Sequence, residues 1–203
     1  MLHYETIEPA TLELLRGLMN EPLLADTRLV GGTALALQLG HRSSIDLDMF
    51  GHFSCDDIEL RAVLASHGTL QVINTSTNVK LFTINGVKVD IVNYDSPWIA
   101  DMVIEDGLRL ASVQEIAAMK IRAIVGRGTR KDFVDLYYLL QQFSMSDILS
   151  LFLKKFPDVN DFIAIRSLTY FEDAEQAPMP LMHTSDSWDA MKAYINKSVM
   201  EIL

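Results

Sequence analysis

The sequence predicts an α+β fold, in which a mixed sheet flanked by helices is followed by an α-helical C-terminal lobe. Up to about residue 108, short alternating apolar segments are interleaved with segments of helical periodicity. From Ser112 onward the apolar periodicity is helical to the end of the chain. Because no Pro/Gly-rich linker separates the halves, we expect a core domain over residues 1–108 and a helical lobe over residues 109–203 that closes a cleft against it.

The first half alternates between helices and strands, and most boundaries carry a local signal. The expected elements are a helix over residues 8–20, the strand Thr27–Val30, a helix over Thr33–Leu39 with Thr33 available as N-cap, the strand Ile45–Phe50, a helix that begins at Ser54 with Asp57 completing a capping box, and the strands Leu70–Ile73, Val79–Ile84 and Val87–Tyr94. Asn85-Gly86 joins the last two strands, and this dipeptide is typical of a tight hairpin turn.

The second half is predicted to contain helices only. The expected elements are a helix that begins at a Ser112–Glu115 capping box and ends near Gly126, a helix from Thr129 to about Phe143, and helices near residues 146–155, 158–168 and 186–201. The clearest irregular segment in this half is Gln176–Pro180.

Composition and charge exclude several classes of protein. The formal net charge of −10 argues against a protein that binds nucleic acid over its whole surface. Residues 108–140 carry six basic and three acidic side chains, which predicts either a basic patch beside an acidic site or a solvated helix face. The chain has no long apolar run, no basic secretory segment at its N-terminus and a single cysteine, Cys55. We therefore expect a cytoplasmic protein with no membrane partner and no disulfide.

Asp46 and Asp48 lie one residue apart inside an apolar segment, where two like charges oppose strand formation. Side chains at positions i and i+2 of a strand share one face about 7 Å apart. The opposite, core-facing side is expected to consist of Ile45, Leu47 and Met49. A half-exposed strand with a charged solvent face would account for this pair, but Asp90 occupies the corresponding polar face of Val87–Tyr94.

If these strands are near neighbours, the three carboxylates meet and require a cation. Carboxylate oxygens select Mg²⁺ or Mn²⁺, whereas scattered histidines and one cysteine do not support zinc. Asp46, Asp48 and Asp90 are therefore the candidate catalytic residues and the ligands of a predicted two-ion site. Asp90 is also a candidate to accept the proton of an incoming hydroxyl.

Gly31-Gly32 ends an apolar strand and leads into a helix, so it presents backbone N–H groups and the positive end of a helix dipole. This arrangement is typical of a phosphate seat, to which the Thr33 hydroxyl can add a donor. The pair matches neither the dinucleotide-binding fingerprint nor the P-loop. Combined with the carboxylates it predicts an NTP substrate, because a triphosphate approaches three carboxylates only when divalent ions lie between them.

These motifs resemble a known superfamily. Gly31-Gly32-Thr33, Arg42-x-Ser44-x-Asp46-x-Asp48 and Asp90 are similar to the pattern of the nucleotidyltransferases that include DNA polymerase beta. GGTALALQLGHRSSIDLDMF more closely resembles the AbiEii/AbiGii toxin family of abortive-infection and toxin–antitoxin systems, with Leu47 and Met49 replacing the usual Ile and Leu. MKIRAIVGRGTRKDFVDLYYLL resembles that family's Lys…Arg…Lys-Asp-x-x-Asp-Leu helix pair, so the similarity covers roughly Leu29–Leu140.

The resemblance implies a nucleotidyltransferase fold and further residues in its cleft. The expected nucleotide- and phosphate-binding residues are Gly31, Gly32, Thr33, Arg42, Ser44, Lys120, Asp132 and Asp135. Three of these side chains can instead act structurally: Lys120 can reach solvent from an apolar stripe, Asp132 can cap its helix, and Arg42 can pair with Asp46 or Asp48. Lys80 can reach phosphate, although an exposed strand position is the favoured expectation.

The leading functional expectation is metal-dependent transfer of a nucleoside monophosphate from an NTP to an acceptor hydroxyl, with release of pyrophosphate. The resemblance adds a toxin role in a toxin–antitoxin or abortive-infection phage-defence system, with RNA such as the tRNA 3′ end as acceptor and a cognate antitoxin as partner. Transfer to a protein or a small molecule, and a non-catalytic NTP-binding module, remain open. Retention of three mutually repelling aspartates argues against a module that has lost catalysis.

Overall fold

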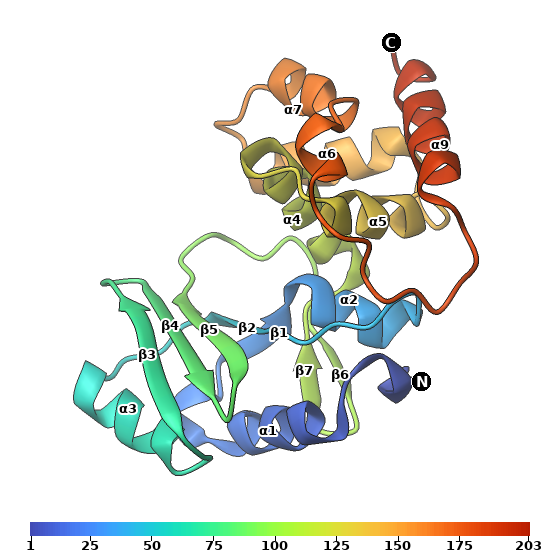
Figure 1. The fold of residues 1–203 in the computed structure, drawn as a ribbon. Helices are drawn as coiled ribbons and strands as arrows, with labels where there is room; N and C mark the ends of the chain where they lie inside the picture. The colour runs from blue at the N-terminus through green and yellow to red at the C-terminus, as the bar shows by residue number, and fades with distance from the viewer.

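A seven-stranded mixed sheet forms the core of the N-terminal half in the computed structural model, which describes residues 1–203 (Figure 1). The strands are β1 (Thr27–Val30), β2 (Leu47–Gly51), β3 (Leu70–Thr75), β4 (Val79–Ile84), β5 (Val87–Asn93), β6 (Val103–Glu105) and β7 (Leu108–Leu110). Their spatial order is β3-β4-β5-β2-β1-β7-β6. The helices are α1 (Pro9–Asn20), α2 (Gly31–Leu39), α3 (Asp57–Ala65), α4 (Val113–Gly126), α5 (Arg130–Leu139), α6 (Met145–Lys155), α7 (Asp161–Leu168), α8 (Glu172–Glu175) and α9 (Trp188–Met200), with short 3₁₀ turns at Tyr4–Thr6 and Pro22–Leu24.

Strand β2 lies in the middle of the sheet, between its antiparallel neighbour β1 and its parallel neighbour β5. Leu47 and Met49 are fully buried, and Asp48 alternates with them on the opposite face. The strand register places Asp48 beside both Val30 of β1 and Asp90 of β5. The parallel pairing of β2 and β5 therefore brings two of the predicted aspartates side by side.

Helix α2 lies between the sheet and the helices of the second half (Figure 1). Its residues Ala34–Leu37 are fully buried, as expected for a helix enclosed by neighbours on all sides. Helices α4 and α5 pack on α2, and α6, α7 and α9 pack on α4 and α5 farther from the sheet. One cluster of buried apolar side chains runs through both halves. The predicted α+β fold, with a mixed sheet followed by a helical lobe, is confirmed.

Two predicted helix starts are wrong, and both errors have a local cause. Helix α3 begins at Asp57 rather than at Ser54, because the side chain of Asp56 caps it by accepting hydrogen bonds from two backbone N–H groups. Helix α2 begins at Gly31, which adopts a left-handed φ of 71°. Thr33 consequently lies inside α2, and it is not the N-cap.

Other boundaries shift by a few residues. Strand β2 begins at Leu47, and Ile45 is 62% exposed instead of contributing to the core. Helix α5 ends at Leu139, before the predicted end near Phe143. The helices α6, α7 and α9 begin at Met145, Asp161 and Trp188, and each is preceded by a Ser or Asn side chain that accepts a backbone hydrogen bond.

The hairpin of β6 and β7 was not predicted from the sequence. Its turn consists of Asp106 and Gly107, both with positive φ, which is typical of two-residue hairpins. Strand β7 pairs in parallel with β1 and continues the sheet beyond it, and α4 begins shortly afterwards at Val113. Each strand has only three residues, which is too short for an alternating pattern to be recognised.

The segment between α8 and α9 leaves the helical lobe and runs down to the connection between α2 and β2 (Figure 1). There Ser43 N donates to Leu181 O, and His183 N donates to His41 O. An isolated bridge pairs Arg42 with Met182. Backbone hydrogen bonds from the lobe therefore hold the chain that enters β2.

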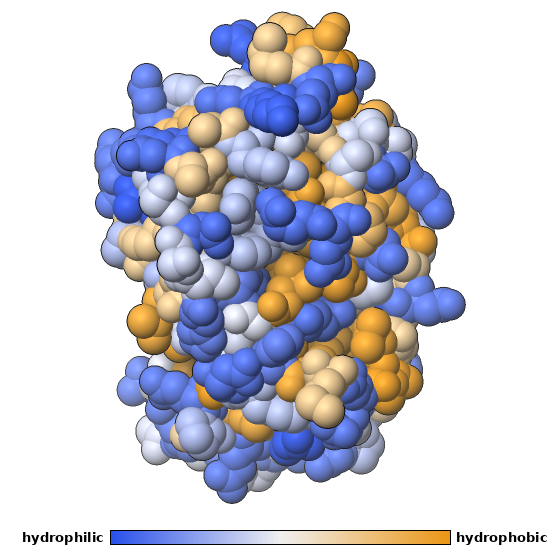
Figure 2. Space-filling view, turned by 90° about the vertical axis from the view of Figure 1, so that its right-hand side faces the viewer, coloured by the Kyte–Doolittle hydropathy of each residue, from blue (hydrophilic) through white to orange (hydrophobic).

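The molecular surface is mixed in character. On the face shown in Figure 2, apolar side chains form separate patches between bands of hydrophilic residues. None of the helices combines the length and the apolar character needed to cross a bilayer.

Candidate active site

Asp48 and Asp90 form the centre of the candidate site. They are paired in the parallel register of β2 and β5, so neighbouring strands present both carboxylates on one face of the sheet. Burial, together with the negative charge of Asp90, raises the pKa of Asp48 to about 6. Asp90 Oδ1 is buried and has no hydrogen-bond partner. A pair of crowded carboxylates with a free buried oxygen has the donor chemistry that Mg²⁺ or Mn²⁺ selects, so these residues fit a divalent ion.

Lysines contact two of the three predicted aspartates. Lys88 Nζ lies 2.5 Å from Asp90 Oδ2, and Lys131 Nζ lies 3.5 Å from Asp46 Oδ2. Asp46 precedes β2 and is not part of the strand face that carries Asp48. The structure contains no group of three or more His, Cys, Asp or Glu side chains placed to share one metal ion. This differs from the expected convergence of all three aspartates, because Asp46 lies before β2 and contacts Lys131, while only Asp48 and Asp90 lie side by side.

The Gly31-Gly32 turn lies directly against these residues. A Cβ atom added to Gly31 would collide with Asp48 Oδ2, and one added to Gly32 would collide with the Arg42 guanidinium. A larger residue at either position would displace the Asp48 carboxylate or the Arg42 guanidinium, and the backbone conformation of Gly31 also favours glycine. The turn brings the N-terminus of α2 to the Asp48 carboxylate, where its N–H groups can receive an anion.

Thr33 and Ser44 fix the chain that enters β2. The Thr33 hydroxyl is buried and donates to the backbone carbonyl of Asp46, and it lies 2.9 Å from Ser44 Oγ. Thr33 therefore holds the Ser44–Asp46 segment against α2, and its hydroxyl faces away from solvent.

A cleft of about 330 Å³ opens between the sheet and α4. It is lined by Val30, Gly31, Asp48, Phe50, Asp90, Ile116, Met119, Lys120, Ala123, Gly126 and Arg127. Asp48 and Asp90 form its acidic wall, while Lys120 and Arg127 form its basic wall. Arg127, whose side chain is 55% exposed, is the accessible cation of this cleft. Sequence reasoning missed Arg127, although its position between Gly126 and Gly128 places it in a turn at the end of α4.

A buried ionic network centred on Asp135 joins α5 to the chain before β2. Asp135 is fully buried and accepts two hydrogen bonds from Arg42, one at 2.7 Å and one at 2.9 Å. Lys120 Nζ lies 2.6 Å from the same carboxylate, and His41 Nε2 lies 2.8 Å from it. Although burial opposes ionisation, Arg42 and Lys120 hold the pKa of Asp135 well below its ordinary value. Arg42 thus pairs with neither Asp46 nor Asp48.

Asp132 is held in a similar way one turn earlier. It is fully buried and is contacted by Arg127, by the Thr129 hydroxyl at 2.6 Å and by Lys120 at 3.2 Å. Burial opposes its ionisation, but Lys120 and Arg127 lower its pKa below the ordinary value. Lys120 does not extend to solvent: it is buried between two carboxylates while still lining the cleft.

Lys80 was expected to be exposed and is instead buried, with 8% of the residue accessible. Its ammonium lies 2.5 Å from Asp57 at the start of α3, outside the cleft. It therefore forms a structural ion pair between β4 and α3.

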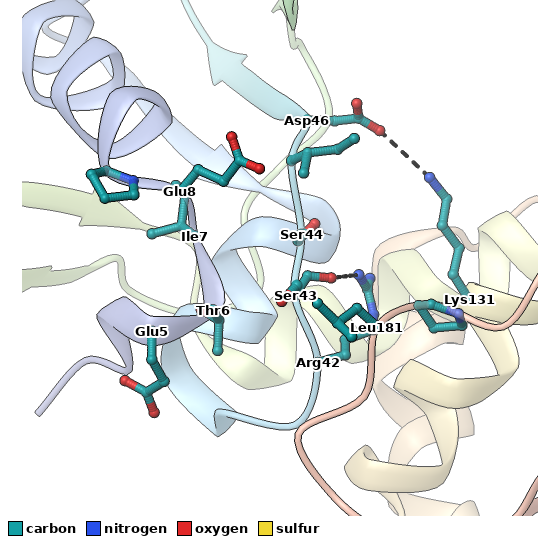
Figure 3. Close-up of a pocket in the computed structure, with 13 residues that line it drawn as sticks. Glu5, Thr6, Ile7, Glu8, Arg42, Ser43, Ser44, Asp46, Lys131 and Leu181 are labelled. Carbon is teal, nitrogen blue, oxygen red and sulfur yellow. Dashed lines mark hydrogen bonds and ion pairs between the residues drawn. The ribbon is translucent and has the colours of Figure 1, made fainter.

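A second cavity, of about 550 Å³, lies on the other side of Asp46 (Figure 3). The N-terminal segment around Glu8, the Arg42–Asp46 segment, Lys131 and the loop residue Leu181 line it. Figure 3 shows Lys131 reaching from α5 to Asp46 across this cavity. Asp46 is thus accessible from this side, while Asp48 and Asp90 face the cleft under α4.

Solved structures of other proteins share this architecture. MenT4, a nucleotidyltransferase toxin from Mycobacterium tuberculosis, superimposes with a TM-score of 0.59 at 18% identity, over 94% of this chain and 81% of that one. The JHP933 protein from Helicobacter pylori superimposes with a TM-score of 0.57 at 18% identity, over 98% of this chain and 90% of that one. The chain therefore has the nucleotidyltransferase fold.

Sequence comparison narrows the class to a family. The model of the family described as nucleotidyl transferase AbiEii toxin, of type IV toxin–antitoxin systems, matches residues 13–201. An uncharacterized protein from Aquifex aeolicus is 27% identical over 197 residues, which cover 94% of this chain and 95% of that protein. The chain belongs to the AbiEii nucleotidyltransferase toxin family, and it is a nucleotidyltransferase.

Proposed function

We propose that this enzyme transfers a nucleoside monophosphate from an NTP to an acceptor hydroxyl in a metal-dependent reaction. The acceptor oxygen forms a bond to the α-phosphorus, the bond between the α-phosphorus and the bridging oxygen breaks, and pyrophosphate leaves. The observation that carries this proposal is the side-by-side pair of Asp48 and Asp90 at the Gly31-Gly32 turn. The cleft combines an anion-binding helix N-terminus with the carboxylates of Asp48 and Asp90. This combination suits a substrate whose phosphates bind together with divalent cations.

Asp48 and Asp90 would hold Mg²⁺ or Mn²⁺, and Asp46 would join them in a two-ion site when Lys131 releases it. When bound, the ions would neutralise the phosphates and stabilise the charge of the attacking and leaving oxygens. Asp90 Oδ1 has no hydrogen-bond partner and is the acceptor proposed for the proton of the incoming hydroxyl.

The phosphate groups are proposed to lie between the N-terminus of α2 and the basic wall of the cleft. Gly31 and Gly32 would offer backbone N–H groups, and Arg127 would offer its exposed guanidinium. Lys120 would contribute positive potential from its buried position. Further residues would not contact the substrate directly but would position the chain before β2 and the basic wall. They are Thr33, Ser44, Arg42, Asp132 and Asp135.

We propose RNA, with the tRNA 3′ end as the first candidate, as the acceptor in a toxin–antitoxin or phage-defence setting. Family membership supports the toxin role, and Arg127 and Lys131 supply half-exposed cationic groups beside the site, each of them paired with an aspartate in this structure. The overall charge of −10 implies that such binding is weak in the absence of specific contacts and falls steeply with salt. A cognate antitoxin protein is the corresponding partner.

A small-molecule or protein hydroxyl is the second candidate acceptor. The cavity of about 550 Å³ beside Asp46 favours it, because the carboxylates of its lining, Glu5, Glu8 and Asp46, outnumber its cations, Arg42 and Lys131 (Figure 3). An acidic lining repels RNA phosphates and attracts a cationic acceptor.

The proposal is tested by incubating the enzyme with each NTP labelled at the α-phosphate, Mg²⁺, and either purified tRNA or an RNase-treated cell extract. Label in tRNA supports an RNA acceptor, and label in protein or in small molecules supports the second candidate. Asp48→Asn and Asp90→Asn are expected to abolish labelling of any acceptor. Labelling by both variants at the wild-type level would refute the proposed chemistry.

A further inference from the structure

Arg28 on β1 carries a buried guanidinium that has no hydrogen-bond acceptor. The residue is 7% exposed, and its Nε and Nη1 atoms are buried without a partner. Its guanidinium stacks on the face of Trp98, with 3.9 Å between the guanidinium carbon and the ring centroid. A stacked ring partly balances the charge but accepts none of the in-plane N–H groups. Because buried donors are nearly always paired, this guanidinium lacks a partner that its geometry calls for.

Arg109, on the adjacent strand β7, is an arginine in the same region whose guanidinium does have hydrogen-bond acceptors. Its Nε donates to Thr27 O, its Nη1 donates to Met19 O, and its Nη2 donates to Leu24 O, all at 2.8 or 2.9 Å. Burial lowers the pKa of both guanidiniums. The two arginines are thus alike in the effect of burial, but only Arg109 has hydrogen-bond acceptors. Arg109 therefore serves as the matched control for Arg28.

The surroundings of Arg28 contain further buried polar groups without partners. Tyr94 OH and Asn93 Oδ1 are buried without partners, and the Tyr94 and Trp98 rings lie 5.0 Å apart. Lys155, 2% exposed, packs over both rings and is paired with the fully buried Glu115. Glu115 and Asp101 are the carboxylates that act on the charge of Arg28, but neither accepts a hydrogen bond from its guanidinium.

Arg28 also lines an open cavity of about 310 Å³. It is lined by Arg28, Trp98, Ile99, Ala100, Asp101 and Met102. The cavity shares no lining residue with the cleft of Asp48 and Asp90, but the strand register places the two near each other. Val30 is paired with Asp48, and Arg28, two residues before Val30, is paired with Phe50 on the same face of the sheet, about 7 Å farther along the strand.

We propose that this cavity is a phosphate-binding subsite in which Arg28 donates hydrogen bonds to phosphate oxygens. A planar guanidinium matches two oxygens of a phosphate and is the preferred side chain for such contacts. A phosphate would supply the hydrogen-bond acceptors that the Arg28 guanidinium lacks. The phosphate has two sources: free inorganic phosphate or pyrophosphate, or a phosphodiester of a nucleic-acid acceptor. The second source rests on the proposed function, whereas the first does not.

Isothermal titration of inorganic phosphate and pyrophosphate tests the subsite without any measurement of activity. Arg28→Met is expected to weaken phosphate binding by at least about tenfold, the loss of one charged hydrogen-bonding partner. Arg109→Met, which removes a guanidinium that is bonded to three backbone carbonyls and does not line the cavity, should leave phosphate affinity unchanged. Asp101→Asn should strengthen binding, because it removes a negative charge from the cavity wall.

Thermal unfolding separates the subsite from a purely structural role. Without phosphate, Arg28→Met should melt at or above the wild-type temperature, because it removes an unpaired buried charge. Arg109→Met should melt below it, because three backbone carbonyls lose their donors. If Arg28→Met does not fold, Arg28→Lys provides the same binding test with the charge retained but the two-oxygen geometry lost.

A short RNA oligonucleotide distinguishes the two sources by competition. If RNA displaces phosphate from the wild type but not from Arg28→Lys, the subsite receives an acceptor phosphodiester. If RNA does not compete, the subsite receives free phosphate or pyrophosphate. The proposal is overturned if the wild type binds no phosphate, or if Arg28→Met and Arg28→Lys bind it as tightly as the wild type does. If the wild-type protein binds phosphate through Arg28 but catalyses no nucleotidyl transfer, the proposed function is refuted and the phosphate subsite is not.

Discussion

Arg42, in the chain that enters β2, and Asp135, in the middle of α5, are joined by two hydrogen bonds of 2.7 and 2.9 Å. The carboxylate is fully buried and is also contacted by His41 and Lys120. One aspartate therefore ties the helical lobe to the segment that carries Ser44 and Asp46. Through Arg42, the Lys-Asp-x-x-Asp element of α5 therefore contacts the segment that enters β2.

Replacing Asp135 by asparagine should destabilise the protein strongly. The variant leaves Arg42 and Lys120 buried with one fewer negative charge, and breaking a buried ion pair in this way costs about 3–5 kcal/mol. The midpoint of urea-induced unfolding measures this loss. Asp189→Asn, which removes a carboxylate that is 91% exposed, should leave the midpoint nearly unchanged. Equal midpoints for the two variants would show that Asp135 does not hold the lobe in place.

The contribution of His41 to the stability of the fold should decrease as the pH falls below 6.5, whereas Asp48, with its raised pKa, contributes in the opposite direction. His41 is 1% exposed, its Nδ1 has no partner, and burial lowers its pKa from the ordinary value of 6.5. Below this pH the unfolded chain binds a proton at this histidine that the folded chain does not bind. The free energy of unfolding then falls, by up to about 1.4 kcal/mol per pH unit, until the folded pKa is reached.

His41→Gln removes this titration and keeps a donor for Asp135. On going from about pH 7 to pH 5, the range in which an ordinary histidine titrates, its unfolding temperature should fall less, or rise more, than that of the wild type. An identical pH dependence in both proteins would exclude His41 as the cause.

Gly31→Ala should impair the active site more than it impairs the fold. Gly31 has a φ of 71°, and an added Cβ would collide with Asp48 Oδ2. Gly86, in the hairpin turn, has a φ of 84° and open space around it. Both substitutions should therefore cost a similar backbone strain of about 1–2 kcal/mol, measured by thermal unfolding. Only Gly31→Ala should reduce nucleotidyl transfer by a large factor, and equal activity in the two variants would contradict the role of Gly31.

The fold class, the central strands and the shared strand face of Asp48 and Asp90 could all be predicted from the sequence. Strict alternation in β2 and β5 determines which side chains share a face, and a parallel pairing then fixes the neighbours. Short elements could not be predicted, since β6 and β7 have three residues each and too few positions for a pattern.

Side-chain partners were harder to predict than strand faces. Arg42 was expected to contact Asp46, Asp48 or phosphate, yet its partner is Asp135, 93 residues away in sequence. Such a long-range pairing depends on how the lobe docks, which no local pattern encodes. Lys88 lies on the same strand face as Asp90, and its contact with that carboxylate follows from the i, i+2 spacing alone.

Lys88→Met should increase the affinity of the site for divalent metal. Lys88 Nζ lies 2.5 Å from Asp90 Oδ2 and competes with a cation for that oxygen. Its side chain is 42% exposed, so solvent screening limits the gain to about fivefold. The Mg²⁺ concentration that gives half-maximal nucleotidyl transfer should decrease accordingly. Lys197→Met, on the distant helix α9, is the control, and a higher Mg²⁺ requirement in Lys88→Met would contradict the competition.

The most direct test of the central claim is the binding of Mn²⁺ in the presence of a non-hydrolysable NTP analogue, followed by electron paramagnetic resonance. Asp48→Asn and Asp90→Asn should each weaken Mn²⁺ binding by at least about tenfold, because each removes a carboxylate ligand from the proposed site. Asp95→Asn, an exposed position after β5, should bind Mn²⁺ as the wild type does. Unchanged Mn²⁺ affinity in both Asp48→Asn and Asp90→Asn would show that this pair of aspartates is not the metal centre of the enzyme.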